Sequence, residues 1–329
     1  RLPVHSTWSE WESGPLGGIV PCNNCHMPPN PSLGNSIDIE SDELIEPGIA
    51  GGFWRVPGTT RHHQWVGPRF DGQRMLELAA AVSIAKTVAD GSLIAEVTVK
   101  HVGPGHAIPT GEPLRSIVLS VRAYCDEDEL EPSGGHVVPD FGGYEEMRDG
   151  SLDWGAWPEA MVGDTLRVVE VTADFHDYRG FGPFGDGSFS PADKGMPVER
   201  WVGESIIVTV NEDGSVVLDQ PLPQGSRVYR VREAAAGSAR QAAGAPGFGF
   251  ARVMVGADGE RMVPHFAAVD VASDNRLLPF DQWTSTHLFV APCPDPVVET
   301  KLMYRSIPRP LAVSKGQAWT ESKMQEVRR

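Results

Sequence analysis

The stretch Ser92-Leu93-Ile94-Ala95-Glu96-Val97-Thr98-Val99-Lys100 alternates between two kinds of side chain along most of its length. A period of two places the odd-numbered apolar residues from 93 to 99 on one face of a strand and Glu96, Thr98 and Lys100 on the other. The alternation recurs at 117–123, and shorter β runs follow at 206–210, 227–231, 250–255, 287–291 and 297–304. Because turn sequences separate these runs, the pattern predicts a mainly β fold, an antiparallel sandwich.

Residues 71–91 show a different period. Asp71 is a candidate N-cap, Gly91 follows the last apolar position, and apolar residues recur at helical spacing, namely Met75, Leu78, Ala79, Val82, Ala85 and Val88. We therefore expect a helix over 71–91 that connects an irregular N-terminal segment, 1–70, to a β-sandwich domain, 92–329. A stretch near 139–197 is rich in Gly, Asp and aromatic residues, and we expect it to be a long insertion in that domain.

The charge balance of the chain restricts its partners. Its 329 residues include 28 Lys and Arg against 44 Asp and Glu, a formal net charge of −16, which argues against nucleic acid and anionic membrane surfaces. No stretch of 18 consecutive apolar residues occurs, so we expect no membrane span. Cationic redox partners or divalent cations suit this charge, and the run Asp126-Glu127-Asp128-Glu129 is a candidate Ca²⁺ site.

The segment Cys22-Asn23-Asn24-Cys25-His26 carries the chemistry of the chain. The pattern C-x-x-C-H is typical of a c-type haem attachment site, in which two thiols bond the porphyrin and the adjoining His binds the iron. A zinc site would need a second pair of ligands at similar spacing, whereas the other two cysteines, Cys125 and Cys293, stand alone. The sequence therefore predicts covalently bound haem c, with Cys22, Cys25 and His26 as its attachment site.

The second axial ligand of the iron is left open by the sequence. His62 and His63 follow the motif by about 36 residues, and adjacent side chains in extended backbone point to opposite sides, so we expect only one of them to bind iron. His106, in a Gly/Pro turn, is a further candidate contact at the haem edge or with the iron of a neighbouring molecule. His5, near the N-terminus, is a candidate ligand in trans on another subunit.

Several stretches resemble the multihaem cytochromes c in which the last haem motif is followed by a helix and an immunoglobulin-like β domain. They are Trp8-Ser9-Glu10-Trp11-Glu12-Ser13-Gly14-Pro15, Cys22-Asn23-Asn24-Cys25-His26-Met27-Pro28, Arg61-His62-His63-Gln64-Trp65-Val66-Gly67, Gly105-His106-Ala107-Ile108-Pro109-Thr110-Gly111, Asp274-Asn275-Arg276-Leu277-Leu278-Pro279 and Tyr304-Arg305. The resemblance implies an immunoglobulin-like sandwich, a bis-His haem with His62 favoured over His63 as the second ligand, and long-range electron transfer in a redox complex or an extracellular filament. This chain departs from the family in having a single haem motif.

We therefore predict an electron-transfer cytochrome rather than an enzyme, working as a homo-oligomer or with other cytochrome or redox subunits. One alternative is a haem enzyme with an open distal site acting on peroxide or a small nitrogen or sulfur compound, with Arg61, His62 and His63 as acid–base groups. Another is a β-domain binding or scaffold protein with a structural haem.

Cytochrome c maturation outside the cytoplasm predicts an exported, periplasmic or extracellular protein, whose export signal is expected to have preceded Arg1. In such a compartment Cys125 and Cys293 would form either a disulfide or two buried thiols.

Overall fold

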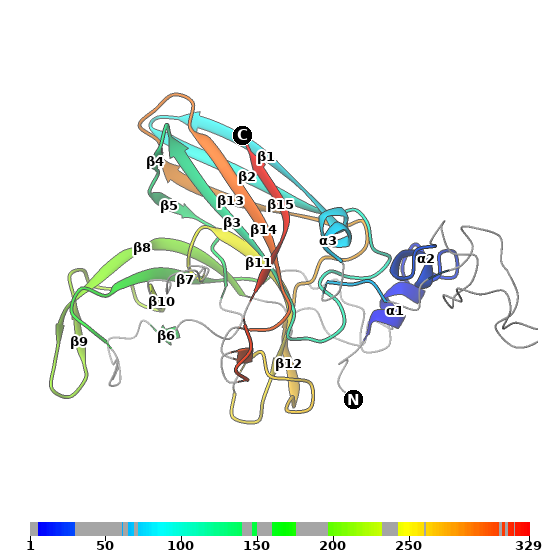
Figure 1. The fold of residues 1–329 in the computed structure, drawn as a ribbon. Coiled ribbons are helices and arrows are strands. Elements are labelled where there is room, and N and C mark those ends of the chain that lie inside the picture. The colour runs from blue at the N-terminus through cyan, green and yellow to red at the C-terminus, as the bar shows by residue number, and fades with distance from the viewer. Residues whose placement is uncertain are drawn as a thin grey trace, which may run out of the picture.

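The computed structural model describes residues 6–29, 61, 65–68, 72–139, 147–149, 160–175, 197–231, 243–259, 261–308, 311–312, 315–318 and 320–329. These residues form a mainly β protein with antiparallel sheets and a few short helices (Figure 1). The predicted fold class is therefore confirmed.

Two of the sheets face each other as a sandwich. The four-stranded sheet has the order β1 (Ala80–Ala89), β2 (Ser92–His101), β13 (Gln282–Val290), β5 (Pro132–Gly135). The second has the order β12 (Asp270–Asp274), β11 (Gly247–Val255), β3 (Ser116–Cys125), β14 (Val297–Arg305), β15 (Glu321–Arg328), with β4 (Asp128–Glu129) paired to β3. Their shared core contains fully buried Leu93, Leu119, Phe289 and Leu302. The alternation along β2 places its odd-numbered apolar residues in this core, as the sequence predicted.

A third sheet is formed by residues 147–231. Its order is β6 (Met147–Asp149), β10 (Ser226–Val231), β7 (Thr165–Phe175), β8 (Pro197–Val210), β9 (Val216–Leu218). The β runs at 206–210 and 227–231 belong to this sheet and not to the sandwich in which we expected them. An alternating run does not reveal which sheet it joins. Most of the insertion expected near 139–197 lies outside the described residues.

The prediction of a helix over 71–91 is wrong beyond residue 79. Helix α3 covers only Gln73–Ala79, and β1 continues directly from it, pairing with β2 from Ala80↔His101 to Ala89↔Ser92. Apolar residues of β1 fit both a helical and an extended period, but β-branched Val82, Ile84 and Val88 favour a strand. The positive φ angles of Asp90 and Gly91, 51° and 74°, close the hairpin to β2.

The N-terminal segment contains two short helices, α1 (Thr7–Glu12) and α2 (Asn23–His26), joined by turns. The Trp11 indole N–H donates to the Val20 carbonyl at 2.9 Å, which closes these turns into a compact unit. Figure 1 places both helices at the end of the molecule where α3 begins, away from β4. None of the helices among the described residues has the length and hydropathy that a membrane-spanning helix needs.

Cys125 and Cys293 form a disulfide with a Cα–Cα distance of 6.0 Å. It joins the end of β3 to the segment that leads into β14, two strands that are already hydrogen-bonded neighbours. The structure thus selects the disulfide over two buried thiols, the alternatives that the sequence left open.

Candidate haem-binding site

The C-x-x-C-H motif lies on a single helical turn. Cys22 is the N-cap of α2, and the His26 amide donates to the Cys22 carbonyl at 3.0 Å. A spacing of three residues puts Cys22 and Cys25 on the same side of the turn. Neither thiol is in a disulfide, and Cys25 is exposed, so both are available for thioether bonds to a porphyrin.

The imidazole of His26 is oriented by residues 65 and 66. Its Nδ1–H donates to the Val66 carbonyl at 2.6 Å, while the Val66 amide donates back to the His26 carbonyl at 2.8 Å. The ring stacks on Trp65, with centroids 4.8 Å apart and planes 7° apart. A carbonyl on Nδ1 fixes the tautomer and leaves the Nε2 lone pair for a metal, the arrangement usual for a metal-binding histidine.

His106 faces His26 from the loop between β2 and β3. The two ring centroids are 6.3 Å apart and the ring planes differ by 17°. Two imidazoles bound on opposite faces of one metal ion, with metal–nitrogen bonds of about 2.0 Å, have their centroids roughly 6 Å apart. His106 also donates its Nδ1–H to a backbone carbonyl, that of Ala107, at 3.0 Å. This spacing and these tautomers would suit two imidazole ligands of one metal ion.

Burial lowers the pKa of the His106 imidazole, which keeps it neutral, the form that binds metals. Within the described part of the chain, Nε2 has no hydrogen-bond partner in either His26 or His106. Trp65 is 57% exposed beside His26 and offers an apolar surface that a porphyrin would cover. The residues present thus fit a haem held between α2 and this loop.

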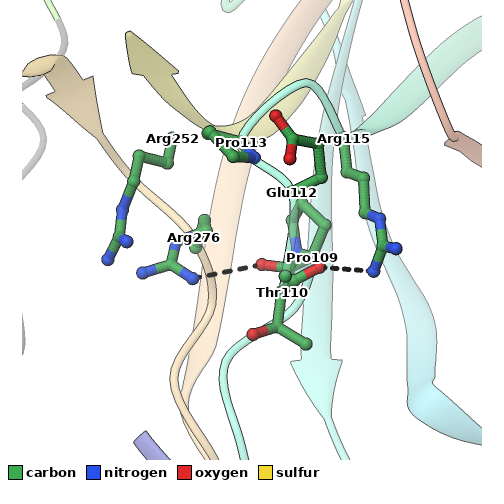
Figure 2. Close-up of a pocket in the computed structure, with 8 residues that line it drawn as sticks. Pro109, Thr110, Glu112, Pro113, Arg115, Arg252 and Arg276 are labelled. Carbon is green, nitrogen blue, oxygen red and sulfur yellow. Dashed lines mark hydrogen bonds between the residues drawn. The ribbon is translucent and has the colours of Figure 1, made fainter. Parts of the chain in front are cut away.

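The loop that carries His106 is fixed at five successive carbonyls, from residue 106 to residue 110. The His106 carbonyl accepts from His101 Nε2 at 2.8 Å, and the Ala107 carbonyl accepts from the His106 imidazole. The Ile108 carbonyl accepts from the Leu277 amide at 3.0 Å. Arg276 donates to the Pro109 carbonyl at 3.4 Å. Arg115 donates to the Thr110 carbonyl at 2.7 Å, from the opposite side of the loop (Figure 2). This accounts for every carbonyl of the segment.

A small cavity lies behind this loop, between Arg115 on one side and Arg252 and Arg276 on the other (Figure 2). Its volume of about 10 Å³ is room for about one water molecule. It is too small to hold a porphyrin.

The other candidate ligands stay predictions. His5, His62 and His63 lie outside the described residues. Arg61, just before them, donates to the Asn23 carbonyl at 2.8 Å and to the Asn24 side chain at 2.9 Å, so the chain returns to the haem motif at this point.

The described residues contain no group of three or more His, Cys, Asp or Glu that would hold a metal ion, and a Ca²⁺ site at 126–129 gains no support. In that run, Glu129 faces Arg122, with 3.7 Å between carboxylate and guanidinium.

Sequence reasoning missed four residues that shape the site: Glu10, Trp65, His101 and Arg276. Three of them lie inside the stretches quoted for the resemblance, but their spacing along the chain reveals nothing of their contacts. Glu10 gave no sequence signal of burial, because glutamate is almost never fully buried unless it is paired, and its partners are distant in sequence.

No protein-family model matches the chain, and no curated protein matches it. Among solved structures, a penta-haem cytochrome c552 from Thermochromatium tepidum is similar, with 14% identity, a TM-score of 0.46, and coverage of 99% of this chain and 50% of that chain. The chain thus spans half the length of that cytochrome. A pore-forming protein has 8% identity and a TM-score of 0.11, covering 76% of this chain and 89% of its own. At these TM-scores neither likeness carries an argument about this chain.

Proposed function

We propose that this protein is a c-type cytochrome that transfers electrons through one haem attached to Cys22 and Cys25, with His26 and His106 as its axial ligands. The observation that carries the proposal is the near-parallel pair of imidazoles with centroids 6.3 Å apart. The haem supplies one-electron redox chemistry when bound. The chain supplies two thiols for attachment, two neutral imidazoles for the iron and backbone carbonyls that hold each Nδ1–H.

Two imidazole ligands favour electron transfer over catalysis. An enzyme acting on peroxide or a small nitrogen or sulfur compound needs one free axial position, whereas in this proposal His26 and His106 would occupy both. The exposure of Cys25 and Trp65 supports a haem edge near the surface, where another redox protein can approach it. The one haem motif of this sequence would exchange electrons with neighbouring redox groups, and the net charge of −16 suits a cationic partner surface.

An exported location, periplasmic or extracellular, belongs to this proposal. Covalent haem attachment takes place outside the cytoplasm, and the Cys125–Cys293 disulfide is stable in an oxidising compartment.

Visible absorption spectra of the ferric and dithionite-reduced protein, with and without CO, test the proposal. We expect a low-spin wild type that binds CO only slowly, and a His106→Ala variant that binds CO at once and regains the low-spin spectrum when imidazole is added. The variants His62→Ala and His63→Ala serve as matched controls and are expected to behave like wild type. If His62→Ala opens the iron instead, His62 is the second ligand. A wild type that is high-spin and binds CO at once would favour the haem-enzyme alternative.

A further inference from the structure

We infer that Glu10 is a positioning residue for the haem iron, because it fixes the distance between the segment that carries His26 and the loop that carries His106. The inference rests on the proposed function, in which both histidines bind one iron. It concerns a residue that touches neither histidine.

Glu10 is fully buried, although α1 is a helix of only six residues. One carboxylate oxygen accepts from Arg276 Nη1 at 2.7 Å and from the Ser6 hydroxyl. The other accepts from the Thr110 hydroxyl at 2.8 Å. A buried carboxylate is tolerated only where it is paired and hydrogen-bonded, and these partners come from separate parts of the chain.

Arg276 extends this contact to the loop and to β12. Its guanidinium binds Glu10 and the Pro109 carbonyl through Nη1, and both Asp274 oxygens, at 2.9 and 3.0 Å, through Nε and Nη2. Arg252 completes the network, with Nε 2.6 Å from Asp274. Two buried guanidiniums therefore face two buried carboxylates.

Both carboxylates are ionised at neutral pH. Burial alone would raise the pKa of Glu10, but Arg276, the Ser6 hydroxyl and Arg252 together hold that pKa below its usual value. Burial opposes ionisation of Asp274 as well, yet Arg276 and Arg252 lower its pKa to about 2. The network is thus a charge-balanced cross-link between α1, the loop and β12.

The same helix contacts the haem segment. Trp11, next to Glu10, donates to the Val20 carbonyl two residues before Cys22. Trp11 and Leu16 also pack against Gly105, where an added Cβ would lie 3.0 Å from Leu16 Cβ and 3.3 Å from Trp11 Cδ1. Glu10 therefore anchors both sides of the iron site: His26 through residues 11–20, and His106 through Thr110 and Arg276.

Glu10→Gln tests this role, because it keeps the side-chain volume and removes the charge that Arg276 needs. CO reaches the iron of the reduced protein only while His106 is detached. Loss of a charged hydrogen bond in the network is expected to raise the rate of CO binding roughly tenfold or more, with the haem still covalently attached. Glu12→Gln is the matched control, since Glu12 is an exposed glutamate on the same helix, and we expect it to leave the rate unchanged.

Thr110→Val is the second variant and removes one hydrogen bond to Glu10 from the side of the loop. We expect it to raise the CO-binding rate by less than Glu10→Gln does. If Glu10→Gln does not fold, the CO-binding rate of Thr110→Val tests the positioning role of Glu10 instead. Circular dichroism and thermal unfolding of each variant report the fold separately from the iron. A variant that loses stability but stays as inert to CO as wild type overturns the positioning role. A wild type that binds CO as fast as His106→Ala overturns the proposed function, and this inference with it.

Discussion

Replacement of the buried His287 by glutamine is expected to reduce the sensitivity of the protein to mild acid. His287 lies on β13 with no exposed surface, donates Nδ1–H to the His136 carbonyl at 3.0 Å and accepts from the Ser285 hydroxyl at 2.9 Å. Burial, with a smaller contribution from His136, lowers its pKa from 6.5 to about 3. The His287 imidazole is therefore protonated near pH 6.5 in the unfolded chain but only near pH 3 in the folded protein.

The size of the effect follows from this difference. A depressed histidine pKa costs no stability above pH 6.5, and the folded state loses stability as the pH falls from 6.5 toward about 3. At 1.36 kcal/mol per pH unit, His287 removes about 2 kcal/mol of unfolding free energy between pH 7 and pH 5. The buried His101, with its pKa lowered to about 4 mainly by burial, removes a similar amount over the same interval. Glutamine at 287 does not titrate and should remove its share of the decline.

Urea unfolding followed by far-UV circular dichroism at pH 7, 6 and 5 measures this decline. We expect the wild type to lose about 2 kcal/mol more than His287→Gln between pH 7 and pH 5. Ser285→Ala is the control, because it removes a hydrogen bond of His287 but no titrating group, and should lower stability without changing its pH dependence. Parallel pH profiles for wild type and His287→Gln would refute the reasoning.

Two further predictions concern the ends of the molecule. The double change Cys125→Ser and Cys293→Ser releases residues 168 apart in sequence, for which chain entropy sets a ceiling of about 5 kcal/mol. We expect a loss of about 3–5 kcal/mol in urea unfolding with an unchanged haem spectrum; a loss below about 1 kcal/mol would contradict it. Trp65→Leu removes the stack on His26, so the ferric low-spin EPR spectrum should change, while Trp65→Phe should preserve it; identical spectra would disprove the stack's role.

The fold was predictable where the side-chain pattern was local. The alternation along 93–99 placed the correct residues in the core, because one face of β2 meets the opposite sheet and the other does not. The pattern over 71–91 failed because β1 is fixed by ten backbone pairs to β2, a contact that periodicity does not record. The assignment of 206–210 and 227–231 to the wrong sheet has the same cause.

The site was predictable only as far as covalent spacing carries information. The chemistry of haem attachment requires two cysteines and a histidine at fixed spacing, so the spacing of Cys22, Cys25 and His26 alone predicts a haem motif, which stays a prediction. The approach of His106 to His26 depends on how α1 docks on the β domain. This docking uses the contact between Glu10 and Arg276, which are 266 residues apart in sequence. Such distances are outcomes of the whole fold, which is why the sequence left several histidines as candidate ligands.

The five bonded carbonyls of residues 106–110 have a consequence for electron-transfer kinetics. Four of them accept from groups outside residues 106–110, and that of Ala107 holds the His106 imidazole itself. In the proposed function this imidazole therefore has little freedom to shift when the charge on the iron changes. Little movement of a ligand means a small reorganisation energy, and a small reorganisation energy permits rapid electron exchange at low driving force. In the proposed function the loop therefore holds His106 rigidly, which lets the protein pass electrons between partners of nearly equal reduction potential.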